Sequence, residues 1–331
     1  MIFSAMLDSL SLVSKQVGVL FALMVVGFLC NRRKLLNAVA IKGVTELLVL
    51  IVTPCVIVHS FIQQKFAVSL LGDLGWALAV SVFAHVVGAA IAFACLHGRD
   101  KRDPPASGGP DRAGVLRFAV IFSNAGFMGI PLEYALLGAD GVFFGAMYVV
   151  VFNLVCWSLG VAVMCRGMKN VGLRALFVNA GTVGVALGLP FFLFSLKLPE
   201  GVGRPVEMLA DLNTPLAMIM VGWYLAETDF RPVLRCGAAY GVAALRLVAV
   251  PLVVIAAFVG VRACVPTLNP VMAVAISTAA AAPTAALTTV IAARYDKDVS
   301  TATSLVSGTT LLSILTMPPI VGFALWLFSS H

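Results

Sequence analysis

The sequence predicts an all-α polytopic membrane protein with ten transmembrane helices, arranged as two inverted five-helix repeats in which helices 4 and 9 are broken and crossed. Three observations lead to this prediction. Of 331 residues, 61% are apolar and only 11% are charged, whereas soluble chains are about a quarter charged. Apolar runs of about twenty residues, long enough to cross the hydrocarbon core, recur from Leu10 to Phe328. Prolines recur at corresponding places in the two halves.

The apolar runs predict ten spans. They lie at residues 11–31, 38–61, 74–96, 114–137, 141–164, 173–196, 206–227, 234–259, 268–293 and 300–328. Sixteen of the 22 Lys and Arg residues fall in the connections that follow the odd-numbered spans, and four fall in the other connections. Because short cytoplasmic loops retain basic residues, we expect a multi-pass protein of the cytoplasmic (inner) membrane with both termini on the non-cytoplasmic side.

The charge and cysteine patterns exclude several other classes of protein. The net charge of +7 is explained by the loop bias, so no nucleic-acid partner is expected. The seven cysteines form no CxxC pair, so neither a disulfide framework nor a metal site is indicated, and no cofactor is expected. No HExxH or GxSxG motif is present, so an enzyme is not predicted. The polar segment 99–112 reads as a cytoplasmic connection between spans 3 and 4.

The prolines indicate two copies of one unit. Pro54 in span 2 corresponds to Pro215 in span 7, and Pro131 in span 4 corresponds to Pro283 in span 9. This predicts a first repeat at residues 1–165 (spans 1–5) and an inverted second repeat at residues 166–331 (spans 6–10), a plan common among secondary transporters. Coincidence is the alternative, since membrane helices tolerate proline in general.

Spans 4 and 9 contain the candidate binding site. Proline opens a helical turn and small residues let two helices approach closely, so the two broken helices are expected to cross at the midplane. Half-helix N-termini then favour an anion, whereas freed carbonyl groups favour a cation. The alternative is ordinary helix packing by small residues. The candidate substrate-binding residues are Ser123, Asn124, Gly129, Pro131, Pro283, Thr284 and Thr288.

Ionisable residues inside spans are costly and are therefore functional candidates. Arg246 in span 8 is a candidate counter-charge for a substrate carboxylate; snorkelling to the surface or lining a water-filled vestibule is the alternative. The candidates for coupling or gating are Asp211, Asn213, Glu133, His85, Pro54 and Pro215. Proton or sodium coupling is open at this point, and each polar candidate has a structural alternative as a helix cap or packing residue.

Three runs resemble one known family. NAGFMGIPL in span 4, NTPLAMIMVGWYLA in span 7 and AAAAPTAALTTVIAARYDKDVSTATSLVSGTTLLSILTMP through spans 9 and 10 are similar to the auxin efflux carrier family, which includes plant PIN-type carriers and bacterial malonate and malate permeases. The resemblance extends over almost the whole chain. Asn124, seven residues before Pro131, matches the family's crossover asparagine. The chain departs from many relatives after Pro283, where Thr284 stands in place of an asparagine or glutamine.

The resemblance implies an architecture and an activity. Spans 1, 2, 6 and 7 would form a scaffold, spans 3–5 and 8–10 would form a mobile transport unit, and the scaffold would form a homodimer. The activity would be elevator-type secondary transport of a small organic carboxylate such as malonate or malate. Two alternatives stay open: a sodium-coupled symporter of the bile-acid or pantothenate carrier type, and an anion receptor that does not transport. The first would need cation sites around the crossover, and span 9 offers only threonines there.

Overall fold

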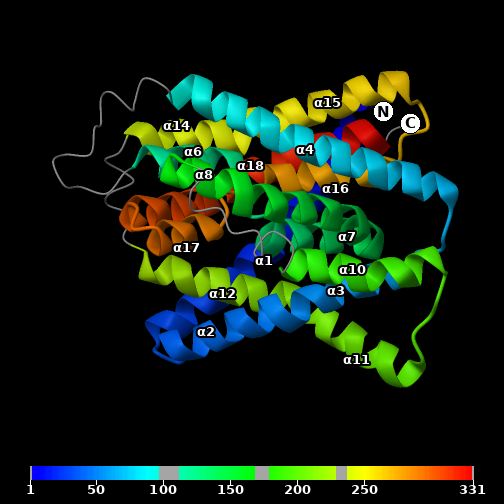
Figure 1. The fold of residues 1–331 in the computed structure, drawn as a ribbon, viewed down its shortest axis with the longest axis horizontal. Coiled ribbons are helices and arrows are strands. Elements are labelled where there is room, and N and C mark those ends of the chain that lie inside the picture. Colours follow the sequence, from blue (N-terminus) through cyan, green and yellow to red (C-terminus); the bar gives the residue numbers. More distant parts are fainter. Residues whose placement is uncertain (1, 97–111, 168–178, 229–236, 330–331) are drawn as a thin grey trace.

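Helices make up almost all of the described structure, a computed structural model that covers residues 2–96, 112–167, 179–228 and 237–329 (Figure 1). Within these residues the β-type pairing consists of one isolated antiparallel bridge, between Ser123 and Thr284. The first half contains α1 (Ile2–Arg32), α2 (Ala38–Leu47), η1 (Leu48–Val52), α3 (Thr53–Gln63), α4 (Val68–Leu96), α6 (Ala113–Ile121), η2 (Ala125–Gly129), α7 (Ile130–Val155), η3 (Cys156–Gly160) and α8 (Val161–Cys165).

The described part of the second half contains one long helix, α18, and several shorter ones. The elements are α10 (Ala180–Leu193), α11 (Glu200–Asp211), α12 (Asn213–Glu227), α14 (Gly237–Ala244), η5 (Leu245–Ala249), α15 (Val250–Cys264), α16 (Pro270–Ala281), α17 (Leu287–Arg294) and α18 (Val299–Ser329). The beginnings of the predicted sixth and eighth spans, and the predicted loop 99–112 apart from Arg112, lie outside the described residues.

Six helical segments are long and apolar enough to cross a membrane. They are Ser4–Arg32, Ala38–Gln63, Val68–Leu96, Ala125–Cys165, Gly237–Cys264 and Val299–Phe328. The 41-residue segment joins the second half of predicted span 4 to predicted span 5, and it bends sharply at Gly138, where φ is 64° and ψ is −150°. Only glycine adopts this backbone geometry at little cost. The protein is therefore an all-helical, polytopic membrane protein, while the count of ten spans stays a prediction.

Prolines explain three local distortions of these helices. The π-helical turns η1, η2 and η5 end two residues before Pro54, Pro131 and Pro251 respectively. Proline lacks an N–H and its ring collides with the carbonyl group four residues earlier. A wider turn at that point removes the collision without breaking the helix, and π-turns of this kind are frequent at functional sites.

Glycines let the helices of the two halves pack backbone to backbone. A Cβ atom on Gly27 of α1 would overlap the backbone of Ile219 in α12, and a Cβ on Gly222 of α12 would overlap the backbone of Met24 in α1. A Cβ on Gly184 of α10 would lie 3.0 Å from the Cβ of Ile57 in α3. Such close approach between small residues is typical of membrane helices. It ties α1 to α12 and α3 to α10.

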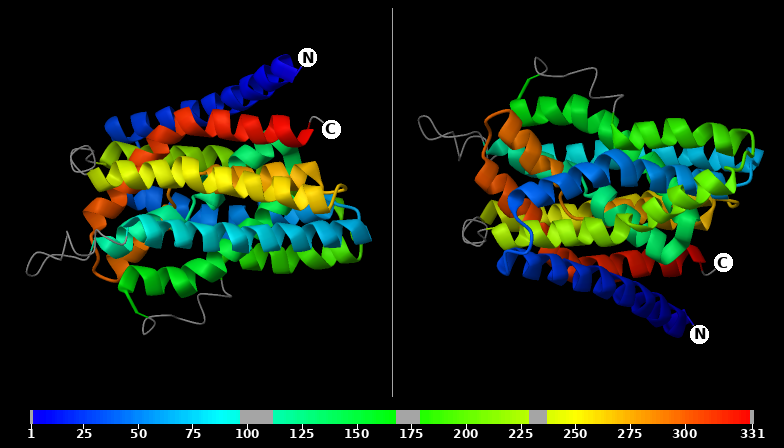
Figure 2. Two further views of the ribbon diagram at one scale, coloured as in Figure 1. Left: turned by 90° about the horizontal axis from the view of Figure 1, so that it is seen from above. Right: turned by 90° about the horizontal axis from the view of Figure 1, so that it is seen from below.

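The outer surface and the two ends of the bundle suit a membrane. Large apolar side chains are exposed on outer helix faces, including Leu50 and Leu315, each 71% exposed. Figure 1 shows both termini at one end of the bundle, whereas the start of α14 and the ends of α8 and α17 lie at the opposite end. Figure 2 shows α1 at the edge of the bundle, with α18 packed against its inner side. Termini that share one end fit an even number of membrane passes.

Candidate functional site

The two predicted helix breaks lie side by side. The chain leaves α6 after Ile121 and resumes helical structure at Ala125, while α16 ends at Ala281 and α17 begins at Leu287. The N–H of Asn124 donates to the Pro283 carbonyl at 2.7 Å, and the N–H of Ala285 donates to the Phe122 carbonyl at 2.9 Å. These bonds form the antiparallel bridge and satisfy backbone groups that the breaks would otherwise leave unpaired.

Two hydroxyl groups fix this crossover to its surroundings. Thr284 is fully buried, and its hydroxyl donates to the Ala119 carbonyl at 3.0 Å. The backbone N–H of Thr284 donates to the hydroxyl of Thr309 in α18 at 3.1 Å. The Ser123 hydroxyl donates to the Tyr148 hydroxyl at 3.1 Å. In this conformation Ser123 and Thr284 therefore hold the crossover in place with their side chains.

Arg246 binds the C-terminal ends of α6 and α16, the two half-helices that lead into the crossover. Its side chain is fully buried, and one guanidinium nitrogen donates to the carbonyl groups of Val120 at 3.1 Å and Ile121 at 3.3 Å, at the end of α6. Another nitrogen donates to the Ala280 carbonyl near the end of α16. Helix C-termini carry partial negative charge. The guanidinium compensates this charge at two helix ends at once.

The two half-helices that follow the crossover, η2 with α7 and α17, begin beside it with their N-termini. Asn124 directly precedes η2 and is 5% exposed, and its side-chain amide forms no hydrogen bond with the described residues. Gly126 and Phe127 of η2 are half-buried, as are Ala286 and Leu287 at the start of α17. Helix N-termini carry partial positive charge and N–H groups without intrahelical partners. With Arg246 compensating the carboxyl ends, the crossover has an electrostatic preference for an anion.

Two further candidates around the crossover are buried with unpaired polar atoms. The Thr288 hydroxyl, in the first turn of α17, is buried and has no partner among the described residues. Glu133 is fully buried two residues after Pro131, and neither of its carboxyl oxygens has a partner in the described part of the chain. A Cβ on Gly129 would lie 3.4 Å from one of these oxygens. Pro131 and Gly129 thus form the turn between the crossover and Glu133.

The residues of predicted span 7 form two helices, α11 and α12, that meet at Leu212. Asp211 ends α11 and accepts a hydrogen bond from the Tyr134 hydroxyl of α7 at 3.3 Å. Asn213 begins α12 with Pro215 in the same first turn, and its side-chain amide is buried without a partner among the described residues. Pro54 lies at the start of α3, directly after η1. Among the described residues, no hydrogen bond joins Pro54, Asp211 or Pro215 to the non-helical segments 122–124 and 282–286 of the crossover.

His85 lies in an aromatic cluster beside the crossover. Its Nδ1 bonds to the Ser81 carbonyl at 2.7 Å, and its ring centroid lies 5.0 Å from that of Tyr148 and 5.7 Å from that of Phe122. The geometry favours a packing histidine. Tyr148 was not singled out from the sequence, because it lies in an apolar run of predicted span 5 with no polar neighbour to distinguish it.

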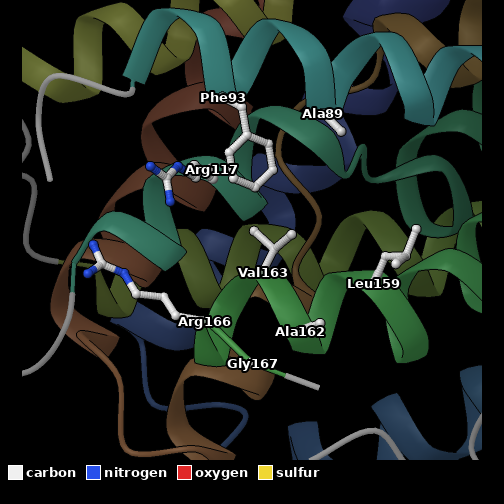
Figure 3. Close-up of a pocket in the computed structure, with 8 residues that line it drawn as sticks. All are labelled: Ala89, Phe93, Arg117, Leu159, Ala162, Val163, Arg166 and Gly167. Atoms are coloured by element: carbon white, nitrogen blue, oxygen red, sulfur yellow. The ribbon is translucent and has the colours of Figure 1, made fainter. Parts of the chain in front are cut away.

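A separate cavity of about 560 Å³ opens between α4, α6 and the end of α8 (Figure 3). Figure 3 shows Phe93 beside Arg117, whose guanidinium carbon lies 4.7 Å from the centroid of the Phe93 ring. Arg166 lines the same cavity, and most of the remaining lining is apolar. None of its lining residues lies in the non-helical segments 122–124 and 282–286 of the crossover. The described residues contain no cluster of three or more His, Cys, Asp or Glu side chains that could hold a metal ion.

Comparison with protein families identifies the family of this chain. A family model described as membrane transport protein matches residues 12–174 and 162–321. The two matched segments meet at residues 162–174, where the sequence predicts the boundary between its two repeats. No curated protein matches the chain.

Proposed function

Since the matched segments show that the chain belongs to the membrane transport protein family of auxin efflux carriers, we propose that it is a secondary carrier of small organic carboxylate anions. Transport of a small-molecule substrate across a membrane follows from the family. The class of substrate is inferred from the crossover. The proposed site consists of the Asn124 amide, the N-terminal turns that begin at Ala125 and Leu287, and the Thr288 hydroxyl.

One observation carries this proposal: the charges at the crossover are compensated on one side only. Arg246 neutralises the carboxyl ends of α6 and α16, while both N-terminal ends keep their partial positive charge and the half-buried surface around Gly126 and Ala286. An anion placed there gains from both helix dipoles. A carboxylate can also accept a hydrogen bond from Asn124, so dicarboxylates such as malonate and malate are the first candidates.

The same observation argues against a sodium-coupled symporter. A sodium site at the crossover would use carbonyl groups freed by the broken helices. The carbonyl groups of Val120, Ile121 and Ala280 already accept hydrogen bonds from Arg246. The guanidinium of Arg246 therefore occupies the place of such a cation and already provides its positive charge.

The packing of the helices supports an elevator mechanism with two inverted repeats. The contacts of α1 with α12 and of α3 with α10 are contacts of predicted spans 1 with 7 and 2 with 6. An inverted repeat interchanges these two pairs, so their joint presence supports it. These four helices would form the scaffold and, as a further prediction, a homodimer, while α4, α6, α7 and α14–α18 would move with the substrate.

The proposal is tested by uptake into proteoliposomes. Labelled mono- and dicarboxylates are screened with the wild-type protein, and Asn124→Ala is compared on the anion that gives the largest signal. We expect Asn124→Ala to lower affinity at least about tenfold, since it removes a hydrogen bond to a charged ligand. Asn179→Ala, which removes an asparagine that caps α10 outside the site, is the control. Unchanged affinity in Asn124→Ala would exclude this site, and binding without uptake would identify a receptor.

A further inference from the structure

Glu133 lies in the transport unit with its carboxyl group enclosed and unpaired. The residue is 0% exposed, and neither carboxyl oxygen has a hydrogen-bond partner in the described residues. Buried carboxyl groups in folded proteins are almost always hydrogen bonded or paired with a cation. This exception lies two residues after Pro131, on the half-helix that begins at the proposed anion site.

Two glycines form the space that holds this carboxyl group. A Cβ atom on Gly145 would overlap Oε2 of Glu133 and lie 3.0 Å from Oε1. A Cβ on Gly129 would lie 3.4 Å from Oε1. The bend at Gly138 folds the two parts of α7 against each other, which places Gly145 opposite Glu133. Any larger residue at position 145 would displace the carboxyl group of Glu133. Glycine thus leaves space for this carboxyl group but offers it no side chain as a hydrogen-bond partner.

No ionisable group forms a hydrogen bond with Glu133 in the described residues. Of the elements that pack against α7, η2, α10 and α16 carry no titratable side chain, whereas α1, α3, α4 and α12 carry Asp8, Lys15, His59, Asp73, His85 and Glu227. Tyr148 on α7 is the described group that interacts with Glu133 electrostatically. The neighbouring groups have other partners: Tyr134 donates to Asp211, Asp140 accepts from Gln64 at 2.6 Å, and His85 bonds to Ser81. No cation among the described residues pairs with Glu133, so its ionised form is uncompensated in this conformation.

We propose that Glu133 is a proton-binding site that moves a proton together with the anion. The proposal rests on the carrier function proposed above and identifies its coupling ion. A neutral carboxylic acid needs no counter-charge and fits the glycine-lined space, whereas sodium requires several oxygen ligands that glycines and helical backbone do not supply. When the first turn of α7 is exposed to water, its N-terminus stabilises the carboxylate, so the proton is released.

Proton and anion binding are coupled through charge. Glu133 lies seven residues from Gly126, about 10 Å at the helical rise. A carboxylate at that distance in a poorly solvated interior repels an anion at the same helix end. The anion therefore binds tightly only while Glu133 carries its proton, which makes the two ligands travel in the same direction.

The test combines transport with proton movement. Proteoliposomes that contain wild-type protein or Glu133→Gln receive the transported anion, and uptake is followed together with external pH. For the wild type we expect external alkalinisation and up to about tenfold accumulation at an inward gradient of one pH unit, the limit for one proton per anion without a membrane potential. Glu133→Gln should bind the anion but equilibrate it without proton movement and without response to the gradient. Glu200→Gln, an exposed acid in the first turn of α11, should behave like the wild type.

Two results would overturn the proton site. One is proton-coupled uptake by Glu133→Gln equal to that of the wild type. The other is the absence, at neutral pH, of an infrared band for a protonated carboxylic acid that is lost in Glu133→Gln. Glu133→Met serves as a second variant, because removing an unpaired carboxyl group costs no hydrogen bond and should not impair folding. If the wild type transports no anion, the carrier function fails, whereas the infrared band still tests the proton site.

Discussion

Arg246 illustrates how a candidate identified at the residue scale changes meaning in three dimensions. Its burial inside a predicted span indicated a functional role, and a substrate carboxylate was the expected partner. Its nitrogens instead contact the carbonyl groups of Val120, Ile121 and Ala280. These residues lie 126, 125 and 34 positions away in the sequence, so no local pattern could identify them as partners. A contribution of Arg246 to anion binding through its long-range charge stays a prediction.

Replacing Arg246 by alanine should destabilise the protein and stop transport. The change leaves three buried carbonyl groups without their donor and the two helix ends without compensating charge, a loss on the order of 3–5 kcal/mol. Apparent melting temperature in detergent and anion uptake measure the two effects. Arg262→Ala is the control, because Arg262 donates to a single carbonyl, that of Leu327, from a half-buried position. A melting temperature for Arg246→Ala equal to that of Arg262→Ala would contradict this role.

At the scale of elements, the sequence predicted where helices break better than how the broken ends pair. Pro283 and the small residues before it placed the break in span 9 correctly, because helix disruption by proline is a local effect. In span 4 the break lies between Ile121 and Ala125, before Pro131, which itself follows the wider turn η2 inside a continuing helix. The hydrogen bonds of Asn124 to Pro283 and of Ala285 to Phe122 depend on segments about 160 residues apart. Residue composition shows that two helices can approach, and only the fold defines their register.

The start of α18 offers a pH-dependent test at the element scale. Asp298 accepts hydrogen bonds from the backbone N–H of Thr301 at 2.9 Å, the Thr301 hydroxyl at 2.7 Å and Nε of Arg112 at 3.2 Å. Partial burial raises the pKa of Asp298, but these hydrogen bonds and the Arg112 charge outweigh burial and leave the pKa lowered. A lowered pKa in the folded state means that the stabilisation is complete above the ordinary value of about 3.9 and is lost as pH falls through the lowered value.

Asp298→Ala should therefore cost about 1 kcal/mol at neutral pH, the usual value of an N-terminal helix cap. The difference in melting temperature between the variant and the wild type should shrink as the pH falls below the ordinary value of about 3.9. Asp298→Asn keeps a side chain that caps the helix and loses only the charge that faces Arg112. It should lose a few tenths of a kcal/mol, typical of an ion pair near the surface. A pH-independent difference for Asp298→Ala would show that ionisation of Asp298 is not involved.

At the scale of the whole molecule, hydropathy and charge predicted membrane insertion and also the place where the longest helical segment reverses. The sequence places the boundary between predicted spans 4 and 5 at residues 138–140, and the structure reverses the chain at Gly138, between two helical parts of Ala125–Cys165. The close approach of Gly145 to Glu133 shows that these two parts lie against each other. The proposed division into scaffold and transport units cannot be predicted from composition, because both would consist of apolar spans.

The division into two units is testable through a contact between them. The Thr228 hydroxyl, at the end of α12, lies 2.6 Å from the Ser307 hydroxyl of α18. These short side chains hold their Cβ atoms within the range that a disulfide bridges. In Thr228→Cys/Ser307→Cys, oxidation should join scaffold to transport unit and abolish uptake, and reduction should restore it.

The control is Ile57→Cys/Gly184→Cys, which links α3 to α10 inside the scaffold, where a Cβ at position 184 would lie 3.0 Å from that of Ile57. Because both residues of the control pair would remain in one unit during an elevator movement, its disulfide should leave uptake intact. Uptake that survives complete oxidation of Thr228→Cys/Ser307→Cys would show that α12 and α18 do not move relative to each other during transport.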